Sequence, residues 1–114
     1  MSRFAKRVDA NHNDIKEAYE KLGVMVIDLS KAAEVVVGGL PDLLCSLHGY
    51  TWLSETKTDV GELDPAQVRF MEEWKGPVYV VRTVDDVVSR VAEIRKMTGL
   101  GKFILPTQKN ASPQ

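Results

Sequence analysis

Two acidic residues and a lysine occupy positions that a β-hairpin would bring together. Asp42 and Glu55 are separated by twelve residues, and His48-Gly49 near the middle of that interval is a turn signal. A hairpin that turns there places Asp42 directly opposite Glu55, so that both side chains share one face of the sheet. Lys57 lies two residues beyond Glu55 and therefore points to the same face. The spacing predicts a cluster of two carboxylates and one amine.

Such a cluster is suited to the hydrolysis of a phosphate ester. Two carboxylates on opposed strand positions, with Cβ atoms about 5 Å apart, repel each other unless a proton or a cation lies between them. Mg²⁺ prefers carboxylate oxygens and keeps several of its waters. A bound divalent cation polarises a phosphate and lowers the pKa of a bound water, and a neighbouring lysine stabilises the charge of the transition state.

The same residues are also compatible with a surface hairpin that has no chemical role. Asp42 follows Pro41 and would then be a strand-edge residue, while Glu55 and Lys57 would belong to a solvated face. The register of the two acids favours the paired site, and so does their apolar setting, because paired acids in an apolar sheet need a compensating partner. The apolar neighbours are Leu40, Leu43, Leu44, Trp52 and Leu53.

The hydrophobic pattern predicts elements in the order α-β-β-β-α-β-α, which is typical of an α/β fold with a mixed sheet flanked by helices. The first helix is expected to begin at Asn11 or Asn13 and to run to Leu22, where Gly23 stops it. Strands are expected over residues 24–29, 42–47, 50–57 and 78–81, and two further helices over about 65–74 and 84–98.

Two of these helices carry clear start signals. Asp64 is a cap with Pro65 at the first helical position, and Thr83 with Asp86 forms a capping box. The last helix has an apolar stripe that predicts a core face or, as the alternative, a dimer face. The stripe consists of Val84, Val87, Val88, Val91 and Ile94.

The composition is that of a globular protein. The 114 residues are 44% hydrophobic, and we expect one domain over residues 1–101 and a flexible tail over 102–114. No apolar run approaches the ~18 residues that a membrane span needs, and the sequence opens without the apolar segment of a secretory signal. Trp52 and Trp74 are expected in the core, with a base-stacking surface as the alternative. Cys45 is also expected in the core, and the single cysteine favours a cytoplasmic, reducing location.

One part of the sequence resembles the motif of the PD-(D/E)XK nucleases. It consists of Pro41-Asp42, twelve intervening residues and Glu55-Thr56-Lys57. The branch that they resemble is the VRR-NUC domain, which includes phage proteins similar to Holliday-junction resolvases. The glycines before Asp42 and Gln67 after the lysine make the resemblance more specific. Other segments that resemble this branch are 7–11, 28–31, 63–67 with Trp74, 76–78 and 82–85, so that it extends over residues 7–92.

The resemblance implies a restriction-endonuclease-like fold and a Mg²⁺-dependent endonuclease, with Mn²⁺ as a substitute ion. The substrate would be DNA, above all branched DNA such as a Holliday junction, and the active form a homodimer in the cytoplasm, with a phage as one source. Asp42 and Glu55 would bind the metal together with the carbonyl of Thr56, and Lys57 would be the catalytic lysine.

The first helix of the family usually carries a glutamate near the metal. The matching position here holds Asp14, and Glu17, one turn further along, is the alternative. Asn11-His12 stands where the family often has Asn-Glu or Asn-Gln. His12 either contacts DNA or is an exposed residue beside the helix cap, and the second interpretation is favoured.

Gln67 also has two interpretations. It stands three residues after Asp64, where it would complete a capping box. In the family a glutamine after the lysine faces the active site. Gln67 shares a helical stripe with Phe70, Met71 and Trp74, which favours the active-site interpretation because this stripe must point to the sheet.

Contacts to DNA are expected from local basic residues. The net charge of −1 gives no general support for binding nucleic acid. Arg3, Lys6 and Arg7 nevertheless form a basic patch near the amino terminus. The residues expected to bind DNA are Arg7, Ser30, Lys31 and Arg69.

The sequence thus leaves three functions open. The leading one is a metal-dependent DNA endonuclease, with Asp42, Glu55, Lys57 and Gln67 in its site. The alternative is a catalytically weak or inactive nucleic-acid-binding module of the same fold. The third is a structural protein whose acids lie on a surface hairpin. The intact set of two acids and a lysine favours the enzyme.

Overall fold

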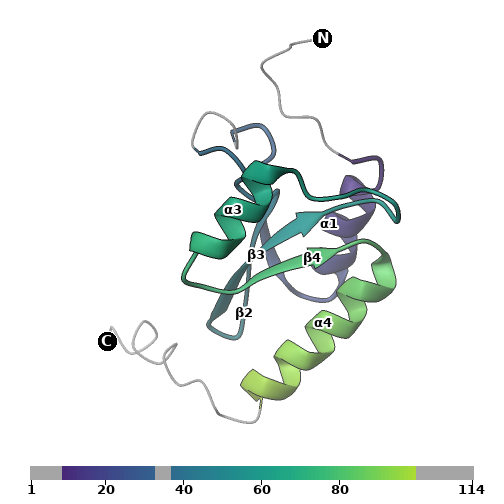
Figure 1. Ribbon diagram of the computed structural model, residues 1–114. Helices are drawn as coiled ribbons and strands as arrows, with labels where there is room; N and C mark the ends of the chain where they lie inside the picture. Colours follow the sequence, from purple (N-terminus) through teal and green to yellow (C-terminus); the bar gives the residue numbers. More distant parts are fainter. Residues whose placement is uncertain (1–8, 33–36, 100–114) are drawn as a thin grey trace.

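One mixed β-sheet forms the centre of the structure (Figure 1). The computed structural model describes residues 9–32 and 37–99. The elements within them are α1 (His12–Lys21), β1 (Met25–Asp28), β2 (Leu43–Leu47), β3 (Tyr50–Thr56), α3 (Pro65–Glu73), β4 (Val78–Val81) and α4 (Val84–Met97). The strand order in this part of the chain is β1-β2-β3-β4, with β3 and β4 parallel and the other pairs antiparallel. The predicted α/β class and element order are confirmed.

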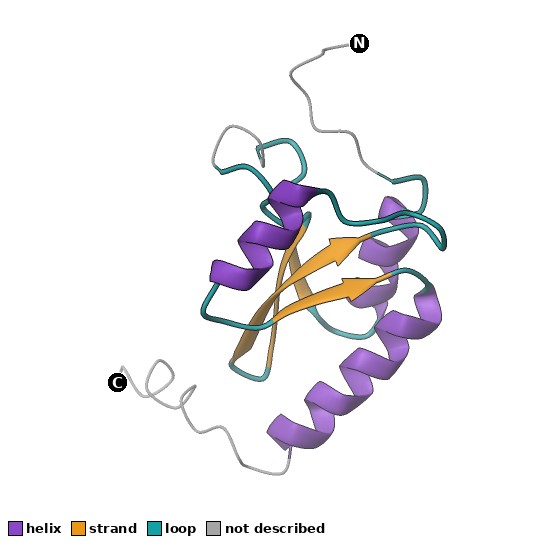
Figure 2. Ribbon diagram, in the orientation of Figure 1, coloured by secondary structure: helices purple, strands orange, loops and turns teal. Residues whose placement is uncertain are grey.

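Side chains along the strands point alternately to the two faces of the sheet, and different helices cover these two faces (Figure 2). On one face, residues of β2 and β3 pack against α1 and α4, and Cys45 and Trp52 lie in this core as predicted. The other members of the core are Ile15, Ala18, Tyr19, Val24, Leu43, Leu47, Val81, Val87, Val91 and Ile94. Helix α3 lies on the opposite face.

Trp74 corrects one expectation about the core. Its side chain is 47% exposed and stacks on Phe70, with ring centroids 5.4 Å apart. Trp74 is the C-cap of α3, so it lies beyond the last turn that reaches the sheet. The expectation that it is a core residue is therefore wrong.

The β2–β3 hairpin has the predicted register, with Leu43 opposite Ser54. His48 (φ 52°) and Gly49 (φ 81°) make its turn. A left-handed backbone suits glycine but is uncommon for other residues. His48 Nδ1 lies 3.0 Å from Thr98 Oγ1, and this hydrogen bond fixes the turn to the carboxyl end of α4.

The predicted helix starts are confirmed at α3 and α4. Asp64 with Gln67, and Thr83 with Asp86, form complete capping boxes. Asn11 is the N-cap of α1, but its side chain makes no capping hydrogen bond. It contacts the ends of two strands instead.

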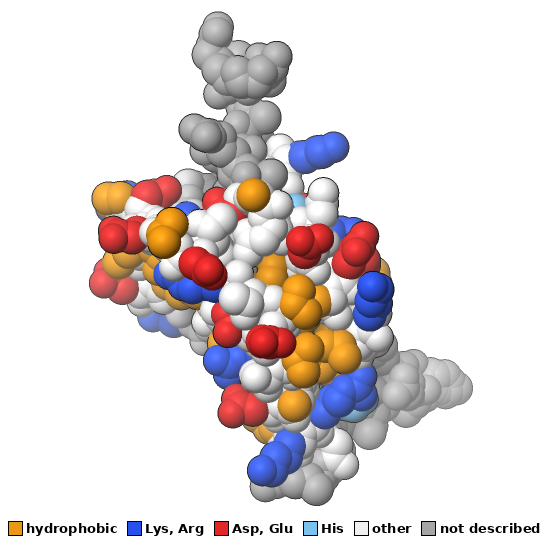
Figure 3. Space-filling model, turned by 90° about the vertical axis from the view of Figure 1, so that its right-hand side faces the viewer, with side chains coloured by type: hydrophobic (Ala, Val, Ile, Leu, Met, Phe, Trp, Pro, Cys, Tyr) orange, Lys and Arg blue, Asp and Glu red, His pale blue; other side chains and the backbone are white. Residues whose placement is uncertain are grey.

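The apolar stripe of α4 is only partly buried. Val87, Val91 and Ile94 belong to the core, whereas Val84 and Val88 are 45% and 46% exposed. The two exposed valines lie at one margin of a stripe that is wider than the surface it packs against, so the expectation that all five face the core is wrong. On the side of the molecule shown in Figure 3, exposed hydrophobic side chains lie among acidic and basic ones.

The strand directions bring several segments to one end of the sheet, which we call the site end. β1, β3 and β4 finish there and β2 begins there. Helix α1 also begins there, because Asn11 Nδ2 donates to the carbonyls of Lys57 and Arg82. No helix among residues 9–32 and 37–99 is long and apolar enough to cross a bilayer.

Candidate active site

Asp42 and Glu55 are buried at the site end. Asp42 directly precedes β2, Glu55 lies in β3, and each is 2% exposed. The backbone N–H of Thr56 donates to Asp42 Oδ2 over 3.2 Å, so the Asp42 carboxylate reaches the end of β3. The two acids are therefore placed on adjoining chain segments, and the alternative of a solvated surface hairpin is wrong.

Glu55 and Lys57 form a close pair of opposite charge. Lys57 Nζ lies 4.0 Å from Glu55 Oε2, and the lysine side chain is only 12% exposed. Charges in such a partly buried position are screened less by solvent than charges on the surface. The ammonium group is therefore held beside the Glu55 carboxylate.

Gln67 completes the predicted capping box and also contacts Glu55. Its Oε1 accepts from the backbone N–H of Asp64 over 2.9 Å, and its Nε2 donates to Glu55 Oε2 over 2.9 Å. A carboxylate only accepts hydrogen bonds, so a single amide orientation satisfies both contacts. The capping box thus fixes the side chain that in turn orients Glu55.

Gly39 sets the position of α3 relative to this cluster. A Cβ atom on Gly39, whose φ is +84°, would lie 2.2 Å from the carbonyl oxygen of Ala66. Only glycine allows the loop before β2 to approach the first turn of α3 so closely. Gly39 therefore connects the segment that carries Asp42 to the helix that carries Gln67.

His12 is a buried residue of the site end, which corrects the expectation of an exposed histidine. It is 4% exposed, and its Nε2 lies 2.9 Å from Asp28 Oδ2. Its Nδ1 lies 3.9 Å from Asp42 Oδ2. Burial alone would raise the pKa of Asp28, but hydrogen bonds from His12 and Ser30 outweigh it and lower the pKa to about 2. Asp28 is therefore an ionised anchor for the imidazole.

The acids of α1 point away from the site. His12 shares the buried face of the helix with Ile15 and Tyr19, whereas Asp14 and Glu17 are exposed. Positions two and five residues from His12 fall on other sides of a helix with 3.6 residues per turn. The structure therefore does not bring Asp14 or Glu17 to Asp42. They line a shallow pocket of about 210 Å³ with Ala18, Lys21 and Val84.

Two side chains that were not predicted to belong to the site hold the end of β3 in place. Asn11 Nδ2 donates to the carbonyls of Lys57 (3.1 Å) and Arg82 (2.7 Å). The guanidinium of Arg82 donates to the carbonyls of Thr58 (2.7 Å) and Gly61 (2.6 Å). No local sequence pattern indicates these contacts, because they join positions far apart in the chain. They fix the backbone from which Lys57 extends.

The residues expected to bind DNA differ in accessibility. Lys31 and Arg69 are exposed, whereas Ser30 is 6% exposed and donates its backbone N–H to Asp28. Arg7 and the tail over 102–114 lie outside the described residues.

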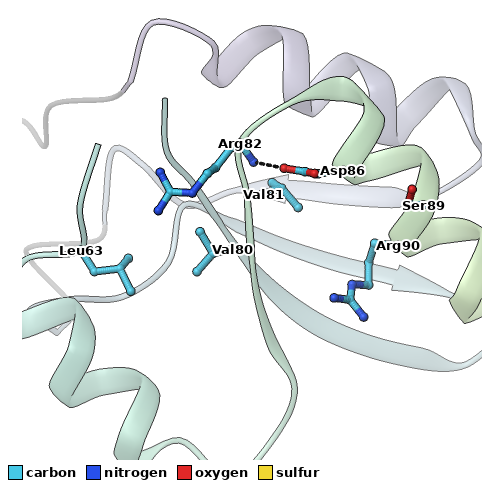
Figure 4. A pocket seen from close by; sticks show the side chains of 7 residues that line it. All are labelled: Leu63, Val80, Val81, Arg82, Asp86, Ser89 and Arg90. Carbon is cyan, nitrogen blue, oxygen red and sulfur yellow. Dashed lines mark hydrogen bonds between the residues drawn. The ribbon is translucent and has the colours of Figure 1, made fainter. Parts of the chain in front are cut away.

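A separate pocket of about 380 Å³ lies beside β4 and α4 (Figure 4). The backbone N–H of Arg82 donates to Asp86 Oδ2 at its rim, over 2.8 Å. The pocket is lined by Leu63, Val80, Val81, Arg82, Asp86, Ser89 and Arg90. Neither of the paired acids belongs to this lining, so the pocket is distinct from the candidate site.

The donor atoms at the site end fit a divalent cation. The carboxylates of Asp42 and Glu55 and the main chain of Thr56 supply oxygen, which Mg²⁺ and Mn²⁺ accept. The buried Nδ1 of His12 has no hydrogen-bond partner. Among the described residues, no group of three or more histidine, cysteine, aspartate or glutamate side chains is arranged to hold a metal ion. An ion here would complete its coordination with main-chain oxygen, water or a further neighbouring atom.

Comparison with known proteins identifies the fold. No family model and no curated protein matches the sequence. A solved structure described as a VRR-NUC domain is 30% identical to this chain, with a TM-score of 0.60, and the match covers 71% of this chain and 89% of the other. The chain therefore belongs to the VRR-NUC domain family of the PD-(D/E)XK nuclease superfamily, as the sequence motif predicted.

Proposed function

We propose that this protein is a metal-dependent endonuclease that hydrolyses phosphodiester bonds in DNA. The burial of Asp42 and Glu55 on adjoining segments, with the Lys57 ammonium 4.0 Å from Glu55, is the observation that supports it most directly. Buried carboxylates on neighbouring strands destabilise a fold through repulsion and lost hydration. A divalent cation offsets both effects, and a phosphodiester is the substrate that such a cation and a lysine can activate together.

Each residue of the cluster has its own task in this proposal. Asp42 and Glu55 hold the cation, with the carbonyl of Thr56 as a further ligand. When bound, Mg²⁺ or Mn²⁺ supplies charge that polarises a phosphate oxygen and makes a water more acidic. Lys57 donates its ammonium hydrogens to the reacting phosphate and offsets the negative charge that develops there. Gln67 keeps the Glu55 carboxylate oriented through its 2.9 Å hydrogen bond.

We further propose branched DNA, such as a Holliday junction, as the substrate and a homodimer as the active form. Resolving a junction requires two incisions, and a two-fold symmetric dimer presents two equivalent sites. The exposed Lys31 and Arg69 would contact backbone phosphates, as would Arg7. These proposals are supported by the sequence motif and the family. We also propose a cytoplasmic location, where the single cysteine would stay reduced.

The test is a cleavage assay on linear and four-way DNA with Mg²⁺. The wild type is expected to cut, and Lys57→Ala to cut about 10²- to 10³-fold more slowly while binding DNA normally. Lys96→Ala is the matched control, because Lys96 is an exposed lysine in the last turn of α4. This control is expected to retain the wild-type rate.

Three other outcomes would change the assignment. Equally little cleavage by the wild type and Lys57→Ala, with DNA binding retained, identifies the alternative, an inactive binding module. Wild-type cleavage by Lys57→Ala removes the lysine from the mechanism. Equal rates on linear and four-way DNA remove the preference for branched substrates, and a monomer in sedimentation removes the dimer.

A further inference from the structure

The two nitrogens of the His12 ring have different environments. Nε2 lies 2.9 Å from Asp28 Oδ2. Nδ1 is buried and is one of the polar atoms in the described residues without a hydrogen-bond partner. Most buried polar atoms in proteins have a partner, so this ring nitrogen, 3.9 Å from the buried carboxylate of Asp42, is a candidate ligand-binding atom.

Asp28 fixes which nitrogen of the ring carries hydrogen. An ionised carboxylate can only accept, so Nε2 must be the donor in its contact with Asp28. In the neutral ring, Nδ1 then presents a lone pair. Asp42 Oδ2 lies 3.9 Å away, which is too far for a hydrogen bond. The Nδ1 lone pair of the neutral ring thus lies close to the Asp42 carboxylate without being hydrogen-bonded to it.

The distance between His12 Nδ1 and Asp42 Oδ2 allows both atoms to bind the same ion. Nitrogen and oxygen ligands lie about 2.1 Å from a divalent cation such as Zn²⁺ or Mg²⁺, so two donors of one ion are at most about 4.2 Å apart. The 3.9 Å between His12 Nδ1 and Asp42 Oδ2 falls within this limit. A histidine that binds a metal commonly donates its other N–H to a carboxylate, as His12 does to Asp28.

We propose that His12 is a nitrogen ligand of the cation held at Asp42, with Asp28 as its orienting partner. The inference rests on the proposed function, because it requires a cation at the acid pair. It gives α1 a neutral donor at the site end, on the face opposite to its exposed acids. The His12–Asp28 contact then positions a metal ligand in addition to joining α1 to β1.

A nitrogen ligand changes which ion the site prefers. Mg²⁺ favours a shell made of oxygen alone, whereas imidazole suits later first-row ions such as Zn²⁺. The site is therefore expected to favour Zn²⁺ over Mg²⁺ by a larger ratio than the same site with an oxygen donor at position 12. The variant His12→Gln provides this comparison, because glutamine also donates a hydrogen bond but offers an amide oxygen.

Nuclear magnetic resonance of protein labelled with ¹⁵N in histidine tests the ligand directly. The chain has two histidines, so the spectrum contains one ring of interest and one internal control, His48. Addition of Zn²⁺ is expected to shift His12 Nδ1 in the wild type and not in Asp42→Asn. A His12 signal that stays in place while Zn²⁺ binds at Asp42 overturns the inference.

Calorimetric titration with Zn²⁺ and Mg²⁺ measures the consequence. His12→Gln is expected to weaken Zn²⁺ binding by roughly 10- to 100-fold and to affect Mg²⁺ much less. His48→Ala is the matched control and is expected to bind both ions as the wild type does. An unchanged ratio of the two affinities in His12→Gln would make His12 a structural link only.

Different results would refute the proposed function and the ligand role of His12. A wild-type protein that binds no divalent cation refutes the proposed function together with this inference. Binding that is lost in Asp42→Asn but unaffected by His12→Gln refutes the ligand role of His12 alone.

Discussion

The two ends of the β2–β3 hairpin differ in how their buried polar side chains are hydrogen-bonded. At the turn end, the hydroxyls of Tyr50 and Tyr79 lie 2.6 Å apart, and His48 Nδ1 lies 3.0 Å from Thr98 Oγ1. Thr98 Oγ1 also donates to the carbonyl of Ile94 over 2.7 Å. These polar side chains bind one another or the main chain, and their contacts join the turn to α4 and β3 to β4.

At the site end, several buried polar atoms have no such partner. Within the described residues they include Asn11 Oδ1, His12 Nδ1 and Thr56 Oγ1. The buried carboxylates of Asp42 and Glu55 lie in the same region. An unpaired buried polar group costs free energy comparable to a lost hydrogen bond. The comparison teaches that the turn end satisfies its polar groups within the protein, whereas the site end leaves several without a protein partner, as the proposed cation site requires.

The largest effect that tests this contrast is expected from Asp42→Asn. Cleavage should fall about 10³-fold, because the amide is a poor ligand for the cation. Mg²⁺ at 100 times its Kd should stabilise the wild type by about 2.7 kcal/mol, and this gain should vanish in the variant. Nuclease assays and thermal unfolding with and without Mg²⁺ measure both effects.

Asp59→Asn is the control for that variant, since Asp59 is an exposed acid in the loop after β3. It should change neither quantity. If Mg²⁺ stabilises Asp42→Asn as much as the wild type, the site end does not hold the ion and the contrast between the ends is broken.

An intermediate effect is expected from Gly39→Ala. The new Cβ would lie 2.2 Å from the Ala66 carbonyl oxygen, and the backbone there is left-handed. We expect a loss of about 3 kcal/mol in the free energy of unfolding and a loss of activity, because Gln67 moves with the first turn of α3. Denaturation by urea and the cleavage assay measure these changes.

The neighbouring glycine supplies the matched control. A Cβ on Gly38 meets no atom within 4 Å, so Gly38→Ala should fold and cut normally. Equal stability of the two variants would mean that the close approach of the loop to α3 does not position the site.

The smallest effect is expected at the turn end, from Tyr79→Phe. Loss of the hydroxyl contact to Tyr50 should destabilise the protein by about 1 kcal/mol, while the ring keeps its place under Arg90, whose guanidinium carbon lies 3.9 Å from the ring centroid. Cleavage below the unfolding temperature should stay at the wild-type rate. A strong loss of activity in this variant would show that the two ends are not independent.

Local patterns predicted the parts of the fold that depend on neighbours in sequence. The hairpin register follows from a two-residue period and a turn, and the capping boxes at Asp64 and Thr83 depend on four residues each. The pairing of Leu43 with Ser54 was therefore predictable. The two contacts of Gln67 were also predictable, because the sequence showed both its place in the capping box and its place on the apolar stripe of the helix.

The side chains of α1 show what could not be predicted in this way. Which face of a helix docks on a sheet depends on packing, and the expectation of a metal-site acid at Asp14 or Glu17 followed family resemblance instead of that face. One signal was available, because His12 stands three and seven residues before Ile15 and Tyr19 on the apolar face. The contacts of Asn11 and Arg82 had no signal, since they join chain segments through tertiary structure alone.

The hydrogen bonds of Asn11 have a consequence for the timing of activity during synthesis. This side chain joins positions 46 and 71 residues further along, the second of them at the end of β4. A nascent chain that ends shortly after Lys57 therefore contains both acids and the lysine but lacks β4 and Arg82. If the protein is the proposed nuclease, nascent chains that stop before residue 82 are expected to leave DNA uncut, because the site end is complete only after β4 has been synthesised.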